Sequence, residues 1–147
     1  MDSKNFTSQG GGFSFKLPID WEEYDDGVDG TYAFFNSKSW TGNLRITPIR
    51  SENIPDPTEE KTAKFIKTRL AGNKQAVKLK LGDWDCVHYK KEIKDDDKSF
   101  VVYYWESGKI DSIIICSFTI YKTSEDTKAN RAELILVQSM IRSIIIN

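Results

Sequence analysis

Residues that carry most metal and nucleophile chemistry are scarce in this sequence. Its 147 residues include one histidine and two cysteines, Cys86 and Cys116. Metal sites need several Cys or His ligands at short spacing, so we predict no metal site and no cofactor. The strand registers expected below place the two cysteines on opposite faces of a sheet, where a disulfide cannot form. We therefore expect two buried, reduced thiols.

Long apolar runs and an excess of either charge are also lacking. The run at residues 113–116 is among the longest apolar stretches and is far too short to span a bilayer. The formal net charge is −1, so we expect neither nucleic acid nor a membrane as a partner. The first twelve residues lack the apolar core of a secretory signal, which predicts a cytoplasmic location.

Composition and length indicate one folded domain. Hydrophobic residues make up 39% of the chain and charged residues 29%, and this balance argues against disorder. Residues 1–12 are polar and end in three glycines, so we predict a flexible N-terminal tail there. Residues 13–147 are then expected to form a single domain.

Apolar periodicity predicts a mostly antiparallel sheet with two helices. A helix is expected from Thr58 to Gly72-Asn73, and a second from Ser124, as its cap, to about Arg142. The predicted fold class is α+β: a three-layer α/β/α sandwich with a central sheet of five to seven strands, an inserted helix and a C-terminal helix. Strands are expected at residues 13–17, 31–36, 44–49, 75–81 and 84–93, and on both sides of a hairpin over residues 100–121.

The hairpin over residues 100–121 is predicted to lie in the middle of the sheet. Ser107-Gly108 stands between two β-branched and aromatic runs and indicates a tight turn, which would pair Trp105 with Ile110. Both faces of the hairpin are apolar, so we expect a packed layer above it and another below it.

The segment FSFKLPIDW, residues 13–21, is an aromatic strand followed by a proline and a tryptophan. It resembles the opening of the PsbP-like superfamily, which includes photosystem PsbP proteins, Mog-type nuclear-transport factors and many bacterial domains of unknown function. The order of the predicted elements is similar along nearly the whole chain. The resemblance implies an α/β/α sandwich and a non-enzymatic binding module. The Ran-binding and manganese-site patterns of the superfamily find no match here.

The stretch at residues 20–30 is the most acidic part of the sequence, with six carboxylates among eleven residues. We interpret it as a surface loop, for which solvation without a partner is the plain alternative. Aromatic residues among the acids favour a docking surface for a basic protein, and Trp40 in a polar turn is a further exposed aromatic. The predicted partner-binding residues are Glu22, Glu23, Tyr24, Asp25, Asp26 and Trp40.

The favoured hypothesis is a non-enzymatic, protein-binding domain, such as an adaptor or an immunity-type protein, that docks a basic partner through this acidic loop. The alternative is a small-molecule or lipid-binding domain that uses an aromatic groove between sheet and helix. Folding the strand at 84–93 back onto the hairpin places His88 on the face of Tyr104 and gives the groove residues Trp84, His88, Tyr104 and Trp105.

Enzymatic activity is not predicted. Cys86 and His88 lie two residues apart on one expected strand face, but no nucleophile motif surrounds them. Asp95-Asp96-Asp97 lacks the alternate spacing, central glycine and distal glutamate of a calcium loop, so we interpret it as a charged turn.

Overall fold

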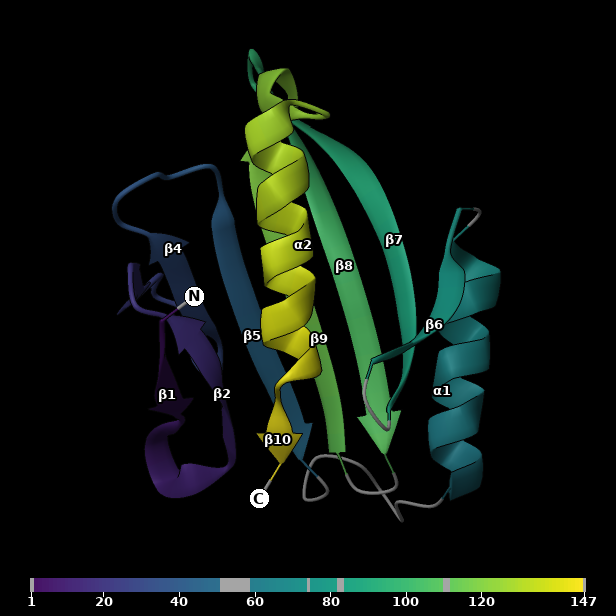
Figure 1. Cartoon of the computed structure of the whole chain (residues 1–147). Coiled ribbons are helices and arrows are strands. Elements are labelled where there is room, and N and C mark those ends of the chain that lie inside the picture. The colour runs from purple at the N-terminus through teal and green to yellow at the C-terminus, as the bar shows by residue number, and fades with distance from the viewer. Residues whose placement is uncertain (1, 51–58, 74, 82–83, 110–111, 147) are drawn as a thin grey trace.

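The computed structural model describes residues 2–50, 59–73, 75–81, 84–109 and 112–146. Within these ranges the chain forms two antiparallel sheets, two α-helices and short 3-10 turns (Figure 1). The predicted α+β class with mostly antiparallel sheets is confirmed. The prediction that all strands lie in one sheet is wrong, because the first two strands and the last strand form a second, smaller sheet.

The larger sheet has seven strands in the order β3-β4-β5-β9-β8-β7-β6, and every neighbouring pair is antiparallel. Its short strands β3 and β6 are the two edges. The bounds are β3 Trp21–Tyr24, β4 Tyr32–Asn36, β5 Asn43–Arg50, β6 Val77–Leu81, β7 Trp84–Asp95, β8 Lys98–Lys109 and β9 Ser112–Tyr121.

The smaller sheet consists of β1 (Ser3–Thr7), β2 (Phe13–Pro18) and β10 (Ile145–Ile146), with β2 in the middle. The prediction of a flexible tail is therefore wrong for residues 3–7, which form β1. Phe6 pairs with Phe15 and lies with its ring centroid 4.9 Å from that of Phe34, so one aromatic residue anchors an otherwise polar segment. The glycines of the expected tail form the turn into β2, where Gly10 and Gly11 have positive φ.

Alternate residues of the larger sheet face two different layers. One face is covered by the smaller sheet and by α2 (Lys128–Arg142), whose buried residues Val137, Met140 and Ile141 pack in the core. The other face carries α1 (Glu59–Gly72), which packs on β7 and β8 with Ile66 against the core there. Figure 1 shows α2 running along the middle strands and α1 beside β6 and β7.

Helix α2 begins later than predicted. Lys122–Ser124 is a separate 3-10 turn, and the cap is Thr127, whose hydroxyl accepts a hydrogen bond from the backbone N–H of Asn130 at 3.1 Å. Ser124 and Thr127 are both good capping residues, so the choice between them depends on where the strand before the helix ends.

The central hairpin is longer than predicted. Strand β8 continues through Ser107-Gly108 to Lys109, which pairs with Ser112. Trp105 therefore pairs with Cys116 rather than with Ile110, which lies outside the described residues. This partner is displaced by six residues, an even number, so each side chain keeps its predicted face.

The register between β7 and β8 differs from the prediction by one residue. Asp95 pairs with Lys98 across a tight turn, whereas the predicted strand ends at residue 93. An odd shift moves every side chain of β7 to the other face. Cys86 therefore lies in the same core as Cys116, and the prediction of opposite faces is wrong. Both cysteines are buried free thiols.

Candidate functional site

The acidic stretch begins with an edge strand rather than a loop. Trp21 is fully buried at the start of β3 and pairs with Asn36, so it fixes the strand against the core. Period-two alternation then places Glu22 and Tyr24 on the face that carries α1, and Glu23 on the other side. The sequence pattern missed this strand because a single buried tryptophan, not an apolar run, holds it in place.

The loop at residues 25–31 closes an acidic hollow against the N-terminal segment. The hollow has a volume of about 440 Å³ and opens to solvent. Glu23, Asp25 and Asp29 are exposed, and they make no ion pair within the described part of the chain. We call this feature the acidic hollow; the residues that matter for its chemistry are Gln9, Glu23, Tyr24, Asp25, Asp29 and Tyr32.

Asp26 and Tyr24 have roles in holding this loop. Asp26 Oδ2 accepts a hydrogen bond from Arg45 Nε at 2.7 Å, and this bond lowers the pKa of the Asp26 carboxyl. The Asp26 side chain is 9% exposed, so its charge is already neutralised inside the domain. The Tyr24 ring meets Phe35 edge-on at 5.6 Å, and burial raises the pKa of its hydroxyl. Of the predicted acids, Asp26 is therefore already paired inside the domain, and Glu22 lies on the opposite side of β3 from Glu23 and does not line the hollow.

Trp40 lies away from the acidic hollow. The hollow's loop joins β3 to β4, whereas residues 37–42 join β4 to β5 at the opposite end of β4. Trp40 is 48% exposed, donates a hydrogen bond from Nε1 to Asn43 Oδ1 at 2.9 Å and packs edge-on against Tyr121. The structure thus brings Glu23, Tyr24 and Asp25 together and leaves Trp40 outside that group.

The predicted aromatic groove is not formed. His88 stacks on Trp105 at 4.8 Å between ring centroids, on the face covered by α2, and Trp105 is buried. Tyr104 lies on the opposite face, where it stacks on Tyr89. The side chain of Trp84 lies outside the described residues. Because the sheet separates Trp105 from Tyr104, these residues cannot line one cavity.

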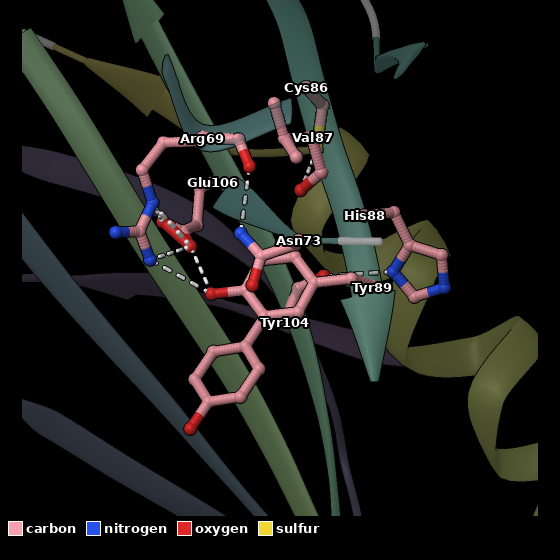
Figure 2. A network of polar contacts seen from close by, with 8 residues as sticks. All are labelled: Arg69, Asn73, Cys86, Val87, His88, Tyr89, Tyr104 and Glu106. Atoms are coloured by element: carbon pink, nitrogen blue, oxygen red, sulfur yellow. Dashed lines mark hydrogen bonds and ion pairs between the residues drawn. The ribbon is translucent and has the colours of Figure 1, made fainter. Parts of the chain in front are cut away.

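A buried polar network joins α1 to the sheet, and sequence reasoning missed it (Figure 2). Glu106 on β8 is fully buried. Its carboxylate accepts hydrogen bonds from Arg69 Nε at 2.7 Å and from Nη2 at 2.6 Å, and a short one from the Tyr89 hydroxyl. Arg69 Nη2 also donates to the Tyr89 hydroxyl at 2.9 Å, and Asn73 Nδ2 donates to the Arg69 carbonyl at 2.7 Å.

The charges of this network anchor α1 to strands β7 and β8. The Glu106 carboxylate raises the pKa of Arg69, and burial, with Glu106 beside it, raises the pKa of Tyr89 to about 12. Each of these bonds to the Glu106 carboxylate is charge-assisted and made within the domain. A signal was present in the sequence: Glu106 is a single carboxylate after a run of buried strand residues, which requires a cation from elsewhere.

The neighbouring Cys86 and His88 are not arranged for catalysis. Burial raises the pKa of the Cys86 thiol to about 11, so the reactive thiolate is disfavoured. His88 Nδ1 lies 2.8 Å from the carbonyl oxygen of Tyr104 and donates its proton there, and burial lowers the pKa of the ring. Among the described residues, no three His, Cys, Asp or Glu side chains gather as a metal site requires. Nor does any helix in the described ranges have the length and apolarity needed to cross a membrane.

The geometry defines a small α+β domain with an acidic edge. Comparison with known proteins gives it a family: residues 1–144 match the model of a domain of unknown function, DUF3805, and the chain belongs to that family. No curated protein matches the chain.

Two solved structures are similar to the chain. A crystal structure from Bacteroides thetaiotaomicron VPI-5482 is 28% identical with a TM-score of 0.78, and the alignment covers 100% of this chain and 49% of that one. The chain therefore spans about half the length of that protein. The solution structure of cyanobacterial PsbP (CyanoP) from Synechocystis sp. PCC 6803 is 13% identical with a TM-score of 0.46, and the alignment covers 99% of this chain and 92% of that one.

Proposed function

We propose that the domain is a non-enzymatic protein-binding module that docks a basic segment of a partner protein in the acidic hollow. The observation that supports the proposal best is one hollow of about 440 Å³ lined by two tyrosines and three exposed carboxylates, which form no ion pair with any other described residue. An adaptor or an immunity-type protein would use such a surface.

The chemistry of the hollow suits a lysine or arginine side chain. Carboxylates that form no ion pair among the described residues attract a cation at long range and pair with it on contact, which favours fast and specific association. Tyr24 and Tyr32 are half-buried at the rim and supply rigid apolar area for the aliphatic part of such a side chain. Asp26 is excluded from this role because Arg45 already neutralises it.

The test compares three baits in partner capture followed by measurement of affinity with the purified partner. The variant Glu23→Gln/Asp25→Asn/Asp29→Asn removes the charge of the hollow but keeps the side-chain oxygens, including the Asp25 oxygen that accepts from the Gly27 N–H. The control Asp95→Asn/Asp96→Asn/Asp97→Asn makes the same charge change in the exposed β7–β8 turn.

We expect a lysine- or arginine-rich partner that binds at least about tenfold more weakly to the hollow variant and in high salt, and normally to the control. Equal binding by both variants, or no partner with the wild type, would contradict the proposal.

The proposal also includes three finer statements. Membership in the PsbP-like superfamily is supported by the motif at residues 13–21, in which β2 leads to the buried Trp21. The arrangement of α1, the larger sheet, and α2 with the smaller sheet is consistent with a variant of the three-layer α/β/α sandwich. A cytoplasmic location suits the two free thiols.

A further inference from the structure

Several polar side-chain atoms lack hydrogen-bond partners where α2 meets the β3 side of the larger sheet. Four of them lie close together in the fold: Trp21 Nε1, Thr41 Oγ1, Asn130 Oδ1 and Glu133 Oε1. All four are shielded from solvent, and none pairs with another residue in the described part of the chain. Buried polar atoms are nearly always paired in native proteins, so a group of four requires a physical explanation.

Three parts of the chain bring these atoms together. Asn130 and Glu133 are three residues apart, share one side of α2, and are 1% and 8% exposed. Glu133 faces the side chains of Thr41 and Asn36, which offset part of the rise in its pKa that burial causes. Trp21 is the cross-strand partner of Asn36, so its fully buried side chain lies on the same face of the sheet. We call the four atoms the polar cluster.

Contacts outside the polar cluster hold it from two sides. A Cβ atom at Gly42 would lie 2.5 Å from the carbonyl oxygen of Thr119, so only glycine lets the turn that carries Thr41 approach β9 this closely. On the other side, Asn130 Nδ2 donates a hydrogen bond to the Tyr103 hydroxyl at 3.3 Å, which leaves Oδ1 as the free end of the amide. The positions of both side chains are therefore set without the use of their unpaired atoms.

The hydrogen-bonding capacity of the polar cluster matches one water molecule. Asn130 Oδ1 and Glu133 Oε1 are acceptors, and a water molecule donates two hydrogen bonds. The Trp21 N–H is a donor and the Thr41 hydroxyl can act as one, and a water molecule accepts two. A cation would pair with the oxygen atoms but would leave the Trp21 N–H without an acceptor. Buried waters with two to four polar partners are a regular part of folded proteins.

We propose that the polar cluster binds one buried water molecule, which ties Trp21 at the start of β3 to α2. Through Trp21 this water positions the edge strand that carries Glu23. The inference does not rest on the protein-binding proposal, since it concerns the covered face of the sheet and requires no partner. The water bonds to Glu133 whether that carboxyl is protonated or ionised, and one such bond offsets only part of the cost of burying a charge.

High-resolution crystal structures of the full chain and of three variants test the proposal. We expect a density peak about 2.6–3.2 Å from at least three atoms of the polar cluster. Glu133→Gln removes the charge and keeps Oε1, so a water should remain, whereas a cation would be lost. Thr41→Val removes one partner and places a methyl group against the site, so the peak should disappear. Thr119→Val makes the same exchange on the opposite face of the sheet and should leave the peak unchanged.

Hydrogen exchange of the Trp21 indole N–H measures the same contact in solution. Without its acceptor this N–H is held less firmly, so its exchange should be at least about tenfold faster in Thr41→Val than in the wild type and unchanged in Thr119→Val. Cooperative urea unfolding would show that each variant folds. The proposal would be overturned by a wild type without the peak, by a peak that is lost in Glu133→Gln, by direct pairing of the Asn130 amide with Glu133, or by equal indole exchange in the two threonine variants.

Discussion

The two faces of the larger sheet differ in what they contribute to the domain. The face under α2 and the smaller sheet is continuous apolar core, with Leu44, Ile46, Cys116 and Phe118 completely buried. The face that carries α1 mixes isoleucine and aromatic residues with serine, threonine and arginine, and most of them are half-buried. Stability should therefore depend mainly on the first face, which leaves the second free for recognition.

The largest difference between the faces should appear at two neighbouring residues of β9. Phe118→Ala removes a ring from the covered core and should lower the free energy of unfolding by about 4 kcal/mol, the transfer loss plus a cavity. Thr119→Ala, one residue along and on the face that carries α1, should change the free energy of unfolding by no more than about 1 kcal/mol.

Urea unfolding at low protein concentration measures both changes. Equal losses would contradict the difference between the two faces.

The ion pair between Arg69 and Glu106 joins α1 to the sheet, and its loss should have the next largest effect on stability. Arg69→Met leaves the buried Glu106 carboxylate without its cation, which should lower the free energy of unfolding by about 3 kcal/mol. Removing the carboxylate as well, in Arg69→Met/Glu106→Leu, should recover more than half of that loss, since no uncompensated charge remains. Denaturant unfolding of the wild type, both single variants and the double variant gives the coupling energy.

A loss below about 1 kcal/mol in Arg69→Met would mean that water replaces the guanidinium, because the Arg69 side chain is 40% exposed.

Much of the fold could be predicted from local patterns. Alternation located most of the strands and apolar periodicity located both helices, because side-chain period follows directly from backbone geometry. Where a single residue decided the structure, the patterns were insufficient. The contacts of Phe6 hold the otherwise polar strand β1 against the core, and the buried Trp21 holds the acidic strand β3.

The candidate site was less predictable because it depends on register. The observed register between β7 and β8 differs by one residue from the predicted one. His88 therefore lies on the face of Trp105, and the expected groove does not form. The pairing of Arg69 with Glu106 spans 37 residues, and local spacing carries no information about such a pair. The acids of the hollow could be identified from composition alone, although the neutralisation of Asp26 by Arg45 required the structure.

The smallest expected effect concerns a polar residue on the covered face. Glu133 on α2 is 8% exposed, and its Oε1 has no hydrogen-bond partner among the described residues. Burial raises the pKa of this carboxyl above its ordinary value of 4.5, and the nearby Thr41 and Asn36 side chains offset part of the rise. A raised folded-state pKa means that the folded protein holds the proton more tightly than the unfolded chain. The stabilisation is complete below pH 4.5 and is lost as the pH rises through the folded-state pKa.

Glu133→Gln keeps the neutral form at every pH. The variant and the wild type should therefore have similar stability near pH 4, and the variant should be more stable near pH 8 by up to about 1 kcal/mol. Urea midpoints of the two proteins across this range measure the difference. A wild type that is the more stable protein near pH 8 would mean that the charged Glu133 carboxylate has hydrogen-bond partners within the covered face. The difference between the two faces of the sheet would then be smaller than the burial of their side chains indicates.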